Sequence, residues 1–152
     1  MLPRPRHISR RALLIGASGF CLSTAPIARA AEVLTFAGLY KSFGVRGMEF
    51  ADRLIELRGK PVSIDGYMAP PLKPESTFFV LTREPVALCP FCQSDAEWPA
   101  DIVVVYLKSV APLVSGGEKV NVSGQLEVGS WTDPQTGFVS QIRVVDASYR
   151  RA

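Results

Sequence analysis

Histidine is almost absent from this 152-residue chain, which contains one, His7. His7 lies in a segment with the features of a secretion signal, so the mature chain would contain no imidazole. Ser-His-Asp and Cys-His triads depend on an imidazole base, and many zinc sites use imidazole ligands. The sequence therefore argues against hydrolases of these kinds. It contains no recognisable catalytic site, and we favour a non-enzymatic role.

The chain also lacks an apolar run of the roughly 20 residues that a membrane-spanning helix needs. The apolar run of residues 12–22 is shorter, follows the basic pair Arg10-Arg11 and precedes the small-residue pattern Ala28-Arg29-Ala30. These are the basic, apolar and cleavage regions of a secretory signal in their usual order. The arginine pair resembles a twin-arginine export signal, although an ordinary secretion signal is the alternative. We expect cleavage after Ala30 and a periplasmic mature protein.

Positive charge becomes scarce once residues 1–30 are removed. Five of the 17 Lys and Arg residues lie in that segment, whereas all 14 Asp and Glu residues follow it. The mature chain would have 12 basic and 14 acidic residues, a net charge of −2 in place of +3. Nucleic-acid binding depends on concentrated positive charge that displaces counterions. We therefore expect no nucleic-acid partner.

The apolar residues of the mature part follow the periods of β-strands. Strict alternation or a continuous β-branched run is present in five segments, namely residues 61–67, 77–82, 102–107, 119–128 and 138–149. In residues 48–57 the apolar positions lie on one helical face, and Gly59 and Pro61 end that pattern. Residues 31–47 show neither period and are expected to form an irregular arm. These patterns predict a mainly β fold with a short N-terminal helix.

Glycines interrupt two of the expected strands, at Gly66 and Gly124. A glycine inside an alternating strand often marks a bulge or a sharp bend, which a small closed barrel needs. Five strands also fit a small barrel better than a sandwich, which would require about seven. We therefore predict that residues 48–152 form a small five-stranded OB-like barrel.

Three short motifs carry a family resemblance: Gly59-Lys60, Gly66-Tyr67-Met68 with Pro70 and Pro71, and Cys89-Pro90-Phe91-Cys92. Residues 57–107, about a third of the chain, resemble through them an uncharacterised group of small exported bacterial proteins. That group has no assigned activity, and its genes are often found beside ABC-transporter genes, some linked to zinc homeostasis. The resemblance implies an accessory role with an ABC transporter or another envelope protein as partner.

Cys89 and Cys92 are the two cysteines that remain after the signal, which contains Cys21. Two thiolates at this spacing supply half of a tetrahedral zinc or copper(I) site. The other ligands would come from the nearby carboxylates Asp95, Glu97 and Asp101. A second copy of the chain is the other source, which would give a homodimer with a shared site of four cysteines. We interpret the pair first as a metal site.

Two other interpretations of Cys89 and Cys92 remain open. Exported compartments are oxidising, so the pair is also consistent with a structural disulfide, although so short a loop constrains the unfolded chain little. A thiol-disulfide exchange protein would use Cys89 as its nucleophile, but the alternating strands and helices of thioredoxin-like proteins are missing. The three interpretations predict different metal contents and different numbers of free thiols in the purified protein.

A proline-rich segment follows the first expected strand. Tyr67 and Met68 lie next to Pro70 and Pro71, and an exposed, stiff loop of this kind is a candidate edge for binding a partner. Prolines at such a position more often end a strand.

Processing provides the first test. Mass spectrometry of the exported protein should give a chain that begins at Ala31. Replacing Arg10 and Arg11 with Lys should block export if the route is the twin-arginine one. A mature chain that retains Cys21 would contradict the predicted localisation.

Overall fold

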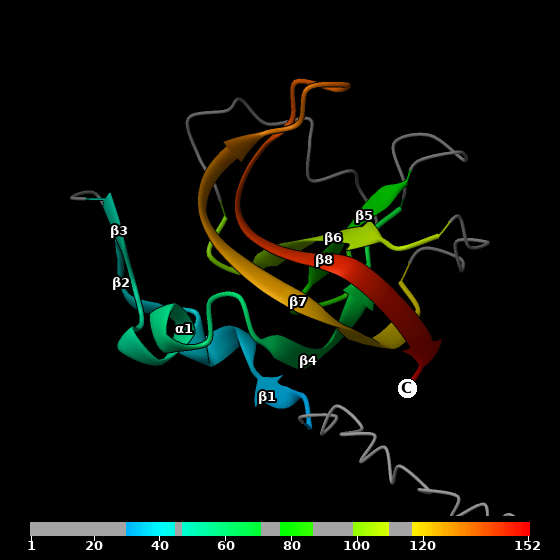
Figure 1. Cartoon of the computed structure of the whole chain (residues 1–152), viewed down its shortest axis with the longest axis horizontal. Helices are drawn as coiled ribbons and strands as arrows, with labels where there is room; N and C mark the ends of the chain where they lie inside the picture. The colour runs from blue at the N-terminus through cyan, green and yellow to red at the C-terminus, as the bar shows by residue number, and fades with distance from the viewer. Residues whose placement is uncertain (1–29, 45–46, 71–76, 87–98, 110–116) are drawn as a thin grey trace, which may run out of the picture.

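The computed structural model describes residues 30–44, 47–70, 77–86, 99–109 and 117–152, which form a mainly β fold with little helix (Figure 1). The elements in chain order are β1 (Glu32–Leu34), the 3-10 helix η1 (Phe36–Gly38), β2 (Tyr40–Gly44), β3 (Gly47–Phe50), α1 (Asp52–Glu56), β4 (Pro61–Met68), β5 (Phe78–Thr82), β6 (Ile102–Leu107), β7 (Lys119–Thr132) and β8 (Val139–Arg151).

Six of these strands form one mixed sheet in the order β1-β4-β5-β6-β8-β7. The β1–β4 and β6–β8 pairs are parallel, and the other pairs are antiparallel. β4 also pairs with β7, from Pro61 opposite Gln125 to Tyr67 opposite Lys119. The hydrogen-bonded order from β4 through β5, β6, β8 and β7 therefore returns to β4. β2 and β3 form a separate two-stranded sheet.

The main core lies on the inward face of this sheet. The alternation predicted for the strands is present, because Val62 and Ile64 of β4 and Val122 and Leu126 of β7 are all fully buried. Burying one such side chain contributes about 1.5–3 kcal/mol to folding. Leu54 of α1 joins the same core, so the helix packs against the sheet.

β5 and β6 are buried on both faces, as the continuous apolar run of residues 102–107 predicted for β6. Alternate residues point into the main core, and the remainder form a second cluster with Phe138 and Val86. Phe78 stacks on Tyr106 and on Phe138 with ring centroids 5.2 and 5.8 Å apart. Because Phe138 directly precedes β8, the end of the β7–β8 hairpin covers the outer face of β5 and β6.

The structure differs from the sequence-based expectation at the N-terminal side. The expected irregular arm over residues 31–47 contains β1, η1 and β2, and the part of the chain that the structure describes has eight strands in place of five. The expected helix over residues 48–57 is shorter, because residues 47–50 pair with β2 as β3. β1 is only three residues long, and β2 and β3 are also short strands that end and begin at Gly44 and Gly47. None of them contains enough apolar residues to show the two-residue alternation of a strand.

Gly124 lies where β7 and β8 change register. Ser123 faces Ser148 and Gln125 faces Val145, so two residues of β8, Asp146 and Ala147, lie opposite one of β7. Asp146 takes the left-handed conformation with φ 49°. A Cβ at Gly124 would lie 2.6 Å from the carbonyl oxygen of Val145. The interrupting glycine therefore marks a β-bulge, as its position within an alternating strand predicted.

This close approach predicts the effect of adding a side chain. Gly124→Val should destabilise the protein by more than the roughly 1 kcal/mol typical of a point substitution, because the backbone of β8 must move. Gly44→Val is the matched control, because nothing lies within 4 Å of a Cβ at that position. Urea unfolding measures both variants. Equal free energies of unfolding for the two would contradict a tight bulge at Gly124.

Candidate functional site

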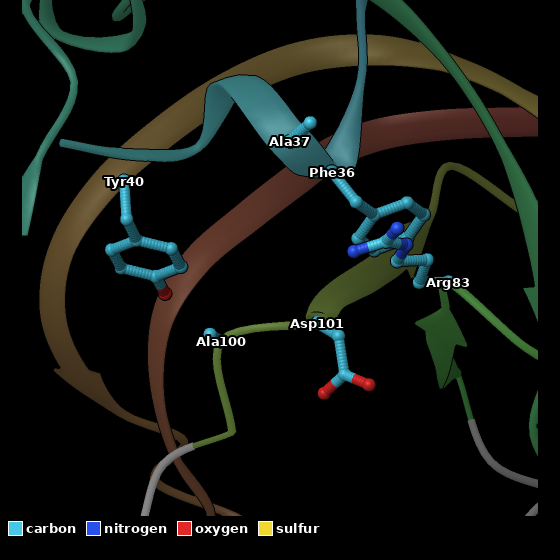
Figure 2. Close-up of a pocket in the computed structure, with 6 residues that line it drawn as sticks. All are labelled: Phe36, Ala37, Tyr40, Arg83, Ala100 and Asp101. Carbon is cyan, nitrogen blue, oxygen red and sulfur yellow. The ribbon is translucent and has the colours of Figure 1, made fainter. Parts of the chain in front are cut away.

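A pocket of about 200 Å³ opens beside the ends of β5 and β6 (Figure 2). Three elements meet there: η1 with the first residue of β2, the chain that leaves β5, and the chain that enters β6. The lining residues are Phe36, Ala37, Tyr40, Arg83, Ala100 and Asp101. The pocket thus combines two aromatic rings with one basic and one acidic side chain.

Backbone pairing fixes the floor of the pocket. Thr82 faces Ile102 in the β5–β6 ladder, and one residue further the amide of Arg83 donates a hydrogen bond of 3.1 Å to the carbonyl oxygen of Asp101. The buried hydroxyl of Thr82 donates to the carbonyl oxygens of Tyr67 and Glu84. The chain on either side of the β5–β6 connection is therefore held in one place.

The aromatic wall depends on Gly66. A Cβ at Gly66 would lie 3.0 Å from Cε2 of Phe36 and 2.7 Å from Cγ of Leu81, so only glycine lets η1 approach β4 this closely. The ring of Tyr40 is held in place by Phe50, on which it stacks with ring centroids 5.7 Å apart. A glycine noted in the sequence for its place in a strand thus also positions one side of the pocket.

The two charged side chains of the pocket are both exposed. Arg83 and Asp101 occupy paired positions across β5 and β6, yet their side chains form no ion pair with each other within the described residues. In Figure 2 the guanidinium of Arg83 and the carboxylate of Asp101 point in different directions. The pocket therefore presents one positive and one negative group at separate points.

The structure places one of the five residues proposed for metal binding. Asp101 lies in the pocket, directly before β6. Cys89, Cys92, Asp95 and Glu97 lie outside the described residues, within the connection between β5 and β6. In the described ranges no group of three or more His, Cys, Asp or Glu side chains gathers to hold a metal ion.

The proposed partner-binding residues do not share one environment. Met68 is fully buried in the main core and is not available to a partner, so its assignment to a surface edge is corrected. It ends β4, where the alternation turns its side chain inward. Tyr67 and Pro70 are half-buried, and Pro71 lies outside the described residues.

A polar cluster at the end of the β7–β8 hairpin was not predicted from the sequence. Asp133 is only 6% exposed, and its carboxylate accepts hydrogen bonds from the amides of Gln135 and Thr136 and, at 3.0 Å, from the hydroxyl of Tyr106. Desolvation alone would raise the pKa of Asp133, but these hydrogen bonds outweigh it and lower the pKa. Asp133-Pro134 with Gly137 predicts a turn. The contact with Tyr106 could not be predicted, because Tyr106 is distant in the sequence.

Arg143 extends this cluster into the interior of the hairpin. Its side chain lies 5.2 Å from the ring centroid of Trp131, pairs with Glu127 at 3.1 Å, and donates to the carbonyl oxygens of Gly129 and Ser140. Every donor and acceptor of the cluster that is fully buried has a partner, so within the described chain the cluster fastens the hairpin rather than offering open groups to a ligand.

The fold has a counterpart among solved structures. It is similar to the crystal structure of a DUF3299 family protein, PA4066 from Pseudomonas aeruginosa PAO1, with a TM-score of 0.51 and 14% sequence identity. The likeness covers 81% of this chain and 98% of that chain. At this identity it establishes the fold alone. No protein-family model and no curated protein matches the sequence.

Helices capable of crossing a membrane are not found among the described residues.

The lowered pKa of Asp133 gives a test of the hairpin cluster. The stabilisation from its ionised form is present above the pKa of the unfolded chain, roughly 3.9 for Asp, and is lost as the pH falls through the lower folded-state pKa. Asp133→Asn should therefore destabilise the protein by roughly 1–3 kcal/mol at pH 7, and by less at pH 3. Urea unfolding at both pH values measures the difference. A gap between wild type and variant that does not change with pH would contradict this role.

Proposed function

We propose that this chain is an exported, non-enzymatic OB-like module that binds zinc or copper(I) through Cys89 and Cys92 and serves an envelope transport system. The OB-like assignment is supported by the five strands β4 to β8, whose pairing returns to its starting strand. A small Greek-key barrel of five strands is the arrangement of the OB-fold. β1 is an addition that pairs with the part of β4 not paired with β5.

The observation that carries the proposal is the position of Asp101. The chain that contains both cysteines leaves β5 at Arg83 and enters β6 at Asp101, and a backbone hydrogen bond of 3.1 Å joins these two residues. The backbone of a residue with a carboxylate side chain is thereby held at the base of the cysteine-bearing connection. Binding groups on connections held by a rigid sheet are a common arrangement in proteins.

The chemistry of the donor set fits a soft or borderline cation. Two thiolates bind zinc at about 2.3 Å and leave the ion half coordinated. Asp101, Asp95 or Glu97 would complete the site within one chain, and a second copy would complete it by sharing four cysteines. Each thiol must lose its proton to bind, so metal uptake releases protons and excludes a disulfide between the same cysteines.

The transport role follows the family resemblance, which is carried by Gly59-Lys60, by Gly66-Tyr67-Met68 with Pro70 and Pro71, and by the cysteine motif. The half-buried Tyr67 and Pro70, together with Pro71, provide a candidate contact with an ABC transporter or another envelope protein. The buried Met68 is omitted from that surface.

Zinc titration of the reduced mature protein tests the metal site. Calorimetry in two buffers should show uptake with proton release, and Cys92→Ser should remove most of it because one of two thiolates is lost. Asp101→Asn should weaken uptake if this carboxylate completes the site, and Asp52→Asn on α1 serves as the matched control. Copper(I) is titrated in parallel.

Equal, weak zinc binding by wild type and Cys92→Ser would overturn the metal site. The reduction potential then separates the alternatives. A value below about −300 mV marks a structural disulfide, and a value in the range of known oxidoreductases marks thiol-disulfide exchange.

A further inference from the structure

The pocket beside β5 and β6 combines features that the proposed metal site does not use. Its volume of about 200 Å³ is below the roughly 300–1,000 Å³ of pockets for drug-sized molecules, so its ligand must be small. Phe36 and Tyr40 supply apolar ring surface on one side, and both rings pack partly against the main core. The rings are therefore fixed in position.

The charges of the pocket are the second observation. Arg83 and Asp101 occupy facing positions, where opposite charges commonly pair for a gain of a few tenths of a kcal/mol to about 1 kcal/mol. They form no ion pair with each other in the described structure, although the backbone hydrogen bond holds the two residues together. In Figure 2 the guanidinium of Arg83 and the carboxylate of Asp101 extend in different directions. A ligand with one charge of each sign would satisfy both.

We propose that this pocket binds a small zwitterion, namely a free α-amino acid with an apolar side chain. The guanidinium of Arg83 would bind the carboxylate, a pairing in which arginine makes strong, charge-assisted hydrogen bonds. The carboxylate of Asp101 would accept hydrogen bonds from the ammonium group. The apolar side chain would lie against the rings of Phe36 and Tyr40.

This inference does not rest on the proposed metal site, because neither cysteine takes part in it. Asp101 is common to both proposals, whereas Arg83 belongs to the pocket alone. Arg83→Gln should therefore leave zinc uptake unchanged, and Cys92→Ser should leave amino-acid binding unchanged. These two variants make the failure of one proposal distinguishable from the failure of the other.

Calorimetry with L-leucine and two truncated analogues tests the pocket. L-leucinamide lacks the carboxylate and 4-methylpentanoate lacks the ammonium group, so both should bind the mature protein at least about tenfold more weakly than L-leucine. Arg83→Gln and Asp101→Asn should each weaken L-leucine binding to a similar extent. Arg58→Gln and Asp52→Asn, which change exposed residues outside the pocket, are the matched controls.

Three results would overturn the proposal. The first is equal binding of L-leucine and either analogue, because the recognition would not need both charges. The second is unchanged L-leucine binding in Arg83→Gln or Asp101→Asn. The third is the absence of binding at millimolar concentration by L-leucine, L-phenylalanine and L-alanine alike. Thermal unfolding of each variant confirms that it is folded, which is expected because both side chains are exposed.

Discussion

The pairing of β4 with β7 is the constraint on which the rest of the structure depends. It joins the first and fourth strands of the five that run from β4 to β8, so each of these strands has a hydrogen-bonded neighbour on both sides. Side chains that alternate along these strands then face a common interior. β7 and β8 change register at Gly124, where the carbonyl of Val145 leaves no space for a Cβ, and again between Val128 and Trp131.

Packing on the outer face holds β5 and β6 at the end of the strand pair opposite the pocket, where Phe78 faces Tyr106. The hairpin of β7 and β8 covers that face with Phe138, and Asp133 joins it to Tyr106 through a hydrogen bond. Buried polar groups are costly unless paired, and the cluster pairs them. The pocket lies at the other end of the same two strands, beside Thr82 and Ile102.

The sequence predicted the strands whose apolar alternation extends over many residues. Alternation located the strands corresponding to β4 and β7, and the interrupting Gly124 indicated the change of register between β7 and β8. The short N-terminal strands carry too few residues for a period, and β1 depends on a partner strand distant in sequence. The pocket was not predictable either, because Phe36, Arg83 and Asp101 meet only after the strands pair, and only Asp101 was noted, for a different reason.

Asp101 links the two proposed ligands. One carboxylate cannot neutralise an ammonium group and donate fully to a metal ion at the same time, so the two ligands would compete if Asp101 completes the metal site. If Asp95, Glu97 or a second chain completes the metal site, the carboxylate of Asp101 can still bind the ammonium group. Metal binding then does not change the charge of the pocket. Linkage requires any such effect to be reciprocal. The affinity for a zwitterion with and without bound metal therefore reports whether the metal recruits Asp101.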